Sequence, residues 1–167
     1  LTRRYARALK HHAKIRQAVP IGGYLEAKEE IKVFAALRPG SLDSEKERCI
    51  EYLRTELEQD PLNRTHTIIL GRLLRMSGDL ESAIGVLTRF IHRREKLDSK
   101  DVADALYNRA CYDTLIWSSD KSKNDLQESI KEDLVESYKL SPENRQDALR
   151  DEDFAPIRGN ALLSSLF

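Results

Sequence analysis

Residues 70–84 read LGRLLRMSGDLESAI, and this stretch decides the fold that we expect. Gly78 is suited to the left-handed backbone conformation that often ends a helix, because glycine has no Cβ atom to clash. Asp79 follows it, and a carboxylate at this position can accept a hydrogen bond from the first turn of a second helix. The stretch therefore predicts two antiparallel helices joined by a tight turn.

These two helices are predicted to pack along an apolar seam. Gly71 on the first helix and Ala83 on the second are small, so we expect them to let the two backbones approach closely. Larger apolar residues recur at helical spacing and would fill the seam; they are Leu70, Leu74, Leu87 and Phe90. Short apolar runs such as 68–70 continue at the same spacing, so we predict no strand.

The rest of the chain also has helical patterns, and its 167 residues are enough for one domain with a continuous core. We predict helices over 2–19, 24–38, 44–59, 64–77, 80–96, 100–117, 124–140 and 142–150, with a last turn within 161–167. Residues 1–40 would form N-terminal helices that are basic at the start, and residues 41–167 a region of paired helices. We expect the two to make one continuous all-α domain.

The net charge and the hydropathy favour a soluble protein. The 28 Lys and Arg residues balance the 28 Asp and Glu residues, so the whole chain gives no reason to expect a nucleic-acid or lipid partner. No apolar run approaches the roughly 18 residues of a membrane-spanning helix. The first residues lack the apolar core of a secretory signal. We therefore expect a cytoplasmic protein, with an organelle-targeted one as the alternative.

The two cysteines, Cys49 and Cys111, fall where small apolar residues are expected. We predict that they pack in a reduced compartment, rather than forming a disulfide or binding a metal. The chain begins with Leu1 instead of methionine, which suggests a fragment of a longer protein.

The register of the central helix pair recurs along the chain. Cys49 and Leu53 stand 34 residues before Ala83 and Leu87. A third unit follows, and it is lengthened by the polar segment 118–125, which we expect to be an exposed loop. The spacing therefore predicts repeated helix pairs of unequal length.

A period of 34 with small residues at these positions, and a proline after Asp60, resembles the tetratricopeptide repeat (TPR). The middle unit carries the Leu-Gly pair at 70–71, the turn glycine and the buried-type alanine. In the third unit, ALYNRACY at 105–112 looks like the first helix of such a repeat. The resemblance covers roughly residues 42–158 and implies a TPR-like α-solenoid of about two to three repeats with capping helices.

The C-terminal segment carries a second resemblance. SPEN at 141–144, followed by RDEDFAPIR at 150–158, looks like the end of many bacterial-type TPR proteins. Ser141 is placed to cap the helix that starts after it. Phe154 and Ile157 can fold back over the last exposed apolar face of the array, as a terminal cap must. We expect residues after them to pack inward instead of forming a partner-binding tail.

In a TPR array, the first helix of each repeat lines a concave face that binds a peptide or a helix of a partner protein. The positions of this chain that the resemblance places on that face are Thr65, Ile68, Arg72, Arg75, Met76, Asp104, Tyr107, Asn108 and Cys111. The resemblance implies that Asn108 holds a ligand backbone and that Arg72 clamps a carboxylate, while Ile68 replaces a polar clamp residue. Arg suits this role because its charge-assisted hydrogen bonds are directional. The alternative is that Arg72 and Arg75 form a solvated helix face.

The N-terminal stretch is strongly basic and has an apolar stripe. Its candidate contacts for an anionic surface are Arg3, Arg4, Arg7, Lys10 and Lys14. A basic amphipathic helix of this kind could contact a membrane surface, an RNA backbone or an acidic protein, or could act as an organelle-targeting segment. The alternative is a first helix of the array that buries its apolar stripe and exposes its charges to water.

Catalytic motifs are absent from the sequence: it has no glycine-rich phosphate loop, no metal-spaced pair of histidines and no nucleophile elbow. We therefore predict a protein that is not an enzyme, with no cofactor, no metal and no small-molecule substrate. Its predicted function is that of a protein-protein interaction scaffold. The alternative is a regulatory or oligomerisation region of a larger signalling or enzymatic protein, with 118–125 as a regulatory insertion.

Overall fold

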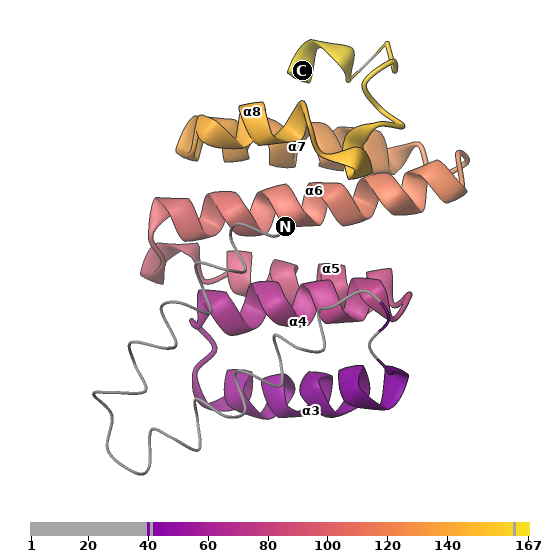
Figure 1. Ribbon diagram of the computed structural model, residues 1–167. Coiled ribbons are helices and arrows are strands. Elements are labelled where there is room, and N and C mark those ends of the chain that lie inside the picture. The colour runs from indigo at the N-terminus through magenta and orange to yellow at the C-terminus, as the bar shows by residue number, and fades with distance from the viewer. Residues whose placement is uncertain (1–39, 41, 162) are drawn as a thin grey trace. The chain divides into compact units, whose positions relative to one another are not determined.

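The computed structural model describes residues 40, 42–161 and 163–167, and in this part of the chain all regular secondary structure is helical (Figure 1). The α-helices are α3 (Asp43–Gln59), α4 (Arg64–Met76), α5 (Leu80–Ile91), α6 (Ser99–Ser119), α7 (Asp125–Leu140) and α8 (Glu143–Ala148). Three short 3-10 segments are η1 (Arg94–Lys96), η2 (Glu152–Phe154) and η3 (Ser164–Leu166). The all-α prediction is confirmed for these residues. The helices predicted over 2–19 and 24–38 lie outside them.

The chain separates into two compact units, Leu1–Cys49 and Ile50–Phe167. Helix α3 crosses this boundary, whereas α4 to α8 and the C-terminal segment lie entirely within the second unit. The division that we predict after residue 40 stays a prediction.

The turn between α4 and α5 has the predicted geometry. Gly78 has a φ of 82°, and its N–H donates to the carbonyl of Arg75 at 3.0 Å, while the Asp79 N–H donates to the carbonyl of Leu74 at 2.9 Å. These two bonds form a Schellman motif, which satisfies carbonyls at the end of α4. The Asp79 carboxylate then accepts from the N–H of Ser82 at 3.1 Å and caps α5.

The seam residues are buried as predicted, since Leu70, Leu74, Leu87 and Phe90 are each at most 2% exposed and Ala83 is fully buried. Gly71 has a wider role than we expected. A Cβ atom placed on it would stand 3.5 Å from the Tyr112 ring of α6, and 3.9 Å from Leu87 of α5. The small residue therefore makes room mainly for an aromatic ring of the next helix pair, and not only for the helix that follows it.

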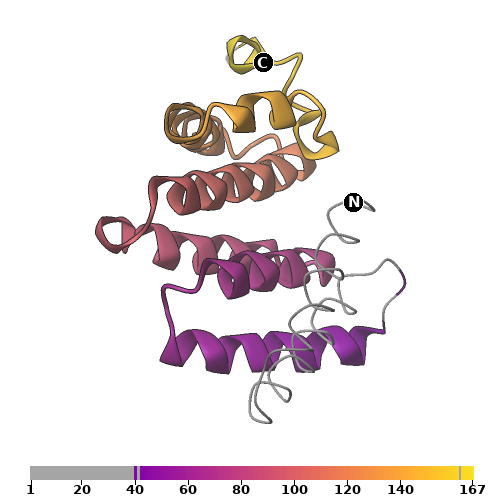
Figure 2. The same cartoon turned by 60° about the vertical axis from the view of Figure 1, so that its left-hand side comes forward.

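Helix α6 packs between α5 and α7, and the two views agree on this layering (Figures 1 and 2). Because it is covered on two sides, α6 buries residues all around its circumference, among them Ala103, Ala110 and Tyr112. The fully buried hydroxyl of Ser137 on α7 donates to the Ala103 carbonyl at 2.8 Å, and the Asn144 amide of α8 donates to Ser137 at 2.9 Å. These bonds fix α6, α7 and α8 to one another.

The C-terminal residues close this stack of helices, as predicted. Phe154, Ile157 and Leu163 are fully buried, and Leu166 is nearly so. The predicted cap at Ser141 is wrong, because α8 begins without a side-chain cap and the Ser141 hydroxyl donates to the Glu143 carboxylate at 3.3 Å instead. The backbone carbonyl of Ser141 accepts the N–H of Asn144 at 3.0 Å in its place.

Several predicted boundaries move by one or two residues, and the end of the helix predicted over 80–96 moves by five. Helix α5 ends at Ile91, because the Arg93 N–H turns back to the Phe90 carbonyl at 2.9 Å and closes the helix before η1. Helix α6 runs on to Ser119 and shortens the predicted loop, where Lys121 lies over the Trp117 ring with its Nζ 3.1 Å from the ring centroid.

Candidate functional site

Four of the residues predicted to bind a partner form an open face on α4. Thr65, Ile68, Arg72 and Met76 recur every three or four residues, which places them on one side of the helix. Thr65, Arg72 and Met76 are exposed and Ile68 is half-buried. Among the described residues, the Arg72 guanidinium has no hydrogen bond and no ion pair. We call these four residues the α4 open face.

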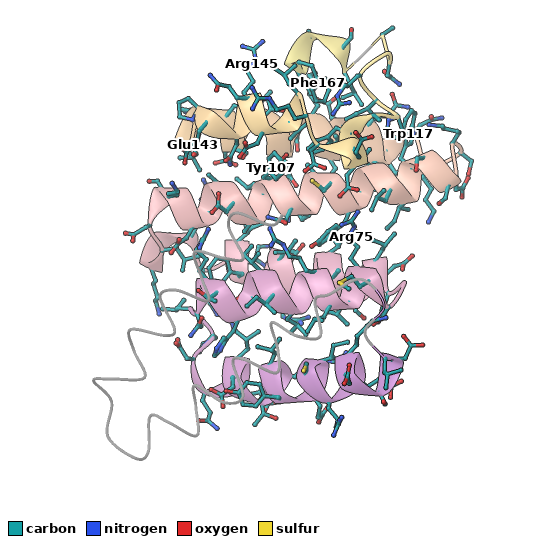
Figure 3. The ribbon with its side chains drawn as sticks, viewed as in Figure 1. Arg75, Tyr107, Trp117, Glu143, Arg145 and Phe167 are labelled. Atoms are coloured by element: carbon teal, nitrogen blue, oxygen red, sulfur yellow. The ribbon has the colours of Figure 1, made fainter. Side chains whose placement is uncertain are left out.

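Arg75, three residues after Arg72 on the same helix, already has an ion-pair partner within the chain. Its guanidinium forms an ion pair with Asp153, which belongs to η2. Figure 3 shows Arg75 between α4 and α6, on the side where η2 contacts α6. Burial raises the pKa of Asp153, and the Arg75 charge acts in the opposite direction. Arg75, which was predicted to contact a partner protein, therefore pairs with a carboxylate of its own chain instead.

Tyr107 of α6 is held by the same C-terminal segment. Its hydroxyl donates to a carboxylate oxygen of Asp151 at 2.9 Å, and its ring meets the Phe154 ring edge-on, with the centroids 5.3 Å apart. Burial raises the pKa of Tyr107, so the hydroxyl stays a hydrogen-bond donor. The aromatic pair adds to the area that Phe154 buries.

We call residues 151–154, which read DEDF, the acidic strap. Its Asp151 carboxylate also accepts the Asp153 N–H at 3.1 Å, which fixes the strap's own conformation. The Arg158 guanidinium donates to the carbonyls of Ala148 and Asp151. It therefore links the chain after the strap to the end of α8 and to the start of the strap. The strap therefore contacts Tyr107 and Cys111, two of the four α6 residues that were predicted to lie on the binding face.

The Cys111 thiol lies beneath the strap. It is 3% exposed, and its sulfur lies 3.9 Å from the Asp151 carboxylate. Together with Asp153, these residues bring three potential metal-ligand atoms within 4.8 Å of one another. Burial raises the pKa of Cys111 well above its ordinary value, so the thiol keeps its proton, and Arg75 already neutralises Asp153. Hydrogen bonds and an ion pair hold this cluster together.

The remaining predicted residues of α6 have internal partners. Asp104 pairs with Arg64 at the start of α4, and the Arg64 Nε also lies 3.1 Å from Asp101. The Asn108 amide donates to the Asp104 carbonyl of its own helix at 2.7 Å. One of the two N–H donors of the amide that the resemblance assigned to a ligand backbone is therefore used within α6.

Sequence reasoning missed a buried charge network behind this surface. Arg109 of α6 donates two hydrogen bonds of 2.7 Å to Asp133 of α7, and a third of 3.1 Å to the Thr88 hydroxyl of α5. Asp113 is 4% exposed and accepts a bond of 3.3 Å from Ser129. Burial raises the pKa of Asp113 to about 6, with a further contribution from the Asp133 charge and opposition from Arg109. The sequence signal that could have revealed this network is the presence of Arg109, Asp113 and Asp133 among apolar residues of their helices.

The basic residues Arg3, Arg4, Arg7, Lys10 and Lys14 lie outside the described residues. None of the helices that the structure describes is long and apolar enough to cross a membrane.

No protein-family model, curated protein or solved structure matches this chain. The resemblance to the TPR family therefore stays a prediction that rests on the residues quoted for it.

Proposed function

We propose that this protein is a non-enzymatic interaction module of TPR type. In this proposal α4–α5 and α6–α7 are repeats, α8 and the C-terminal segment form the cap, and the side presented by α4 and α6 binds a peptide segment of another protein. The tight turn at Gly78 and the buried small residues Gly71, Ala83 and Ala110 support the repeat assignment.

The acidic strap is the observation that carries the proposal. It is a short segment of the chain itself, a single 3-10 turn, held to α4 by one ion pair and to α6 by one hydrogen bond to a tyrosine and one buried phenylalanine. These are the contacts by which a peptide groove holds an acidic segment with an aromatic anchor. A partner segment of similar chemistry would extend along the α4 open face, where the Arg72 guanidinium is available.

Arg72 is the residue that most directly tests this assignment. A peptide library displayed on phage should be selected against the immobilised full chain, and the enriched peptides then measured by fluorescence anisotropy. We expect peptides with a carboxylate next to an apolar side chain. Arg72→Glu should raise their Kd by about tenfold or more, since hydrogen bonds to charged groups contribute about 1.5–3 kcal/mol.

Lys139→Glu supplies the matched control, because it makes the same charge reversal at an exposed position of α7. It should leave the Kd unchanged. The proposal is wrong if selection enriches no peptide, or if Arg72→Glu binds the enriched peptides as the parent chain does.

A further inference from the structure

A groove is lined by residues of the C-terminal halves of α3 and α5, and by Thr67 and Leu70 of α4. Its volume is about 340 Å³. Leu57 of α3 and Phe90 of α5 give it an apolar floor, and Phe90 is 2% exposed. A volume of this size takes one or two side chains and not a large cofactor.

Three arginines surround this floor. They are Arg54 of α3, Arg89 of α5 and Arg93, which lies two residues after the end of α5; all three are exposed, and Glu58 is the only acid among the lining residues. The Arg93 guanidinium donates to the Arg89 carbonyl at 2.6 Å, which keeps it at the end of the helix beside the groove. The groove therefore carries an excess of two positive charges over an apolar surface.

These arginines differ from most others that pack between helices. Arg64, Arg75, Arg94 and Arg109 each pair with a carboxylate of another element. In the described part of the chain, Arg54, Arg89 and Arg93 make no ion pair. Arg54 has only a longer-range electrostatic interaction with Asp79. The three like charges repel one another, and an anionic ligand would reduce this repulsion.

The geometry points to a binding site for an acidic peptide of a partner protein. One aliphatic or aromatic side chain of the peptide would lie on the Leu57 and Phe90 floor, and neighbouring carboxylates would pair with the guanidinium groups. Each pair would be a charge-assisted hydrogen bond, and the fork of a guanidinium can hold both oxygens of a carboxylate. An apolar floor with a cationic rim is complementary to a peptide segment that contains both apolar and acidic residues.

This groove is separate from the α4 open face. On α4 it is lined by Thr67 and Leu70, which lie about 140° and about 160° from Arg72 around the helix. The two sites can consequently be tested independently on the full chain.

The test uses fluorescent peptides of sequence EEDXDEE, in which X is Leu, Phe or Ser, with the full chain in an anisotropy titration. We expect the Leu and Phe peptides to bind with a Kd below about 100 µM, and the Ser peptide to bind about tenfold more weakly. The double substitution Arg89→Gln with Arg93→Gln should raise the Kd of the Leu and Phe peptides by about tenfold or more. Circular dichroism checks that the variant is folded, and Arg54→Gln on α3 gives a second variant with the same expected direction.

Lys139→Gln, at an exposed position of α7 outside both sites, is the matched control and should leave peptide binding unchanged. Because the double substitution leaves Arg72 intact, a loss of binding that it causes is assigned to this groove, and failure here is distinguishable from failure of the proposed function. Equal binding of the Ser and Leu peptides would overturn the inference, because the floor would then have no role. Binding that survives the double substitution would overturn it too. So would tighter binding of inorganic phosphate or of single-stranded oligothymidylate than of the peptides, since the groove would then be a general anion or nucleic-acid site.

Discussion

Replacing Asp113 by asparagine should stabilise the protein at neutral pH. Burial raises the pKa of this carboxyl to about 6 from its ordinary value of 3.8, with the Asp133 charge adding to the effect. Each pH unit corresponds to about 1.4 kcal/mol, so ionising Asp113 costs the folded state about 3 kcal/mol. Asparagine has the shape of the protonated acid and no charge, and its oxygen can still accept the Ser129 hydroxyl.

The sign of the pH dependence follows from the direction of this shift. Because the folded-state pKa lies above the unfolded one, the stability due to protonated Asp113 is fully present below about pH 4 and is lost as the pH rises through 6. The free energies of unfolding of Asp113→Asn and the parent chain should therefore agree at pH 4. At pH 7.5 the variant should be more stable by about 2–3 kcal/mol.

Urea unfolding at the two pH values, followed by circular dichroism, measures this difference. Comparing the two chains at each pH cancels the titration of all other groups. A variant that is less stable than the parent at pH 7.5, or a difference that does not change between pH 4 and 7.5, would refute the reasoning. A constant difference would mean that the pKa of Asp113 is the same in the folded and unfolded states.

Three further substitutions test other parts of the fold, each by urea unfolding at pH 7. Asp133→Asn should lose about 3–5 kcal/mol, because it leaves the Arg109 guanidinium buried without its carboxylate; a change under 1 kcal/mol would mean that Asp113 replaces it fully. Phe154→Ala removes a fully buried ring and should cost about 3–5 kcal/mol, and trypsin should then cleave next to the strap faster than in the parent; unchanged cleavage would contradict the anchoring role of this ring. Gly78→Ala should cost about 1–2 kcal/mol although nothing lies within 4 Å of the added Cβ, because φ is 82° there; an unchanged midpoint would show that the turn can rearrange.

The local features of the fold were accessible from the sequence. The glycine at the end of α4 and the aspartate before α5 each act within a few residues, so their chemistry is visible in a short window. Apolar spacing likewise placed the seam residues in the core. The end of α5 was less predictable, because 92–96 continue the helical pattern while the backbone closes the helix at Ile91.

The contacts of the candidate site were not accessible in the same way. Asp151 and Tyr107 are 44 residues apart, and Asp153 and Arg75 are 78 apart, so only the packing of η2 on α6 brings them together. The sequence predicted that Phe154 would fold back, but not which surface it would cover. The groove lined by Arg54, Arg89 and Arg93 likewise depends on helices that meet only in the folded chain. The spacing of residues along one helix therefore does not reveal it.

The order of the acidic strap in the chain has a consequence for how the protein is made. The ribosome adds Tyr107 44 residues before it adds Asp151. At roughly 5–20 residues per second, the α6 surface exists for about 2–9 seconds before its own covering segment has been synthesised. In the proposed function, a peptide present at that time would also have access to Tyr107, whereas a peptide that arrives later meets the strap there and has only the α4 open face. The contacts that a partner makes during translation and after it would therefore differ.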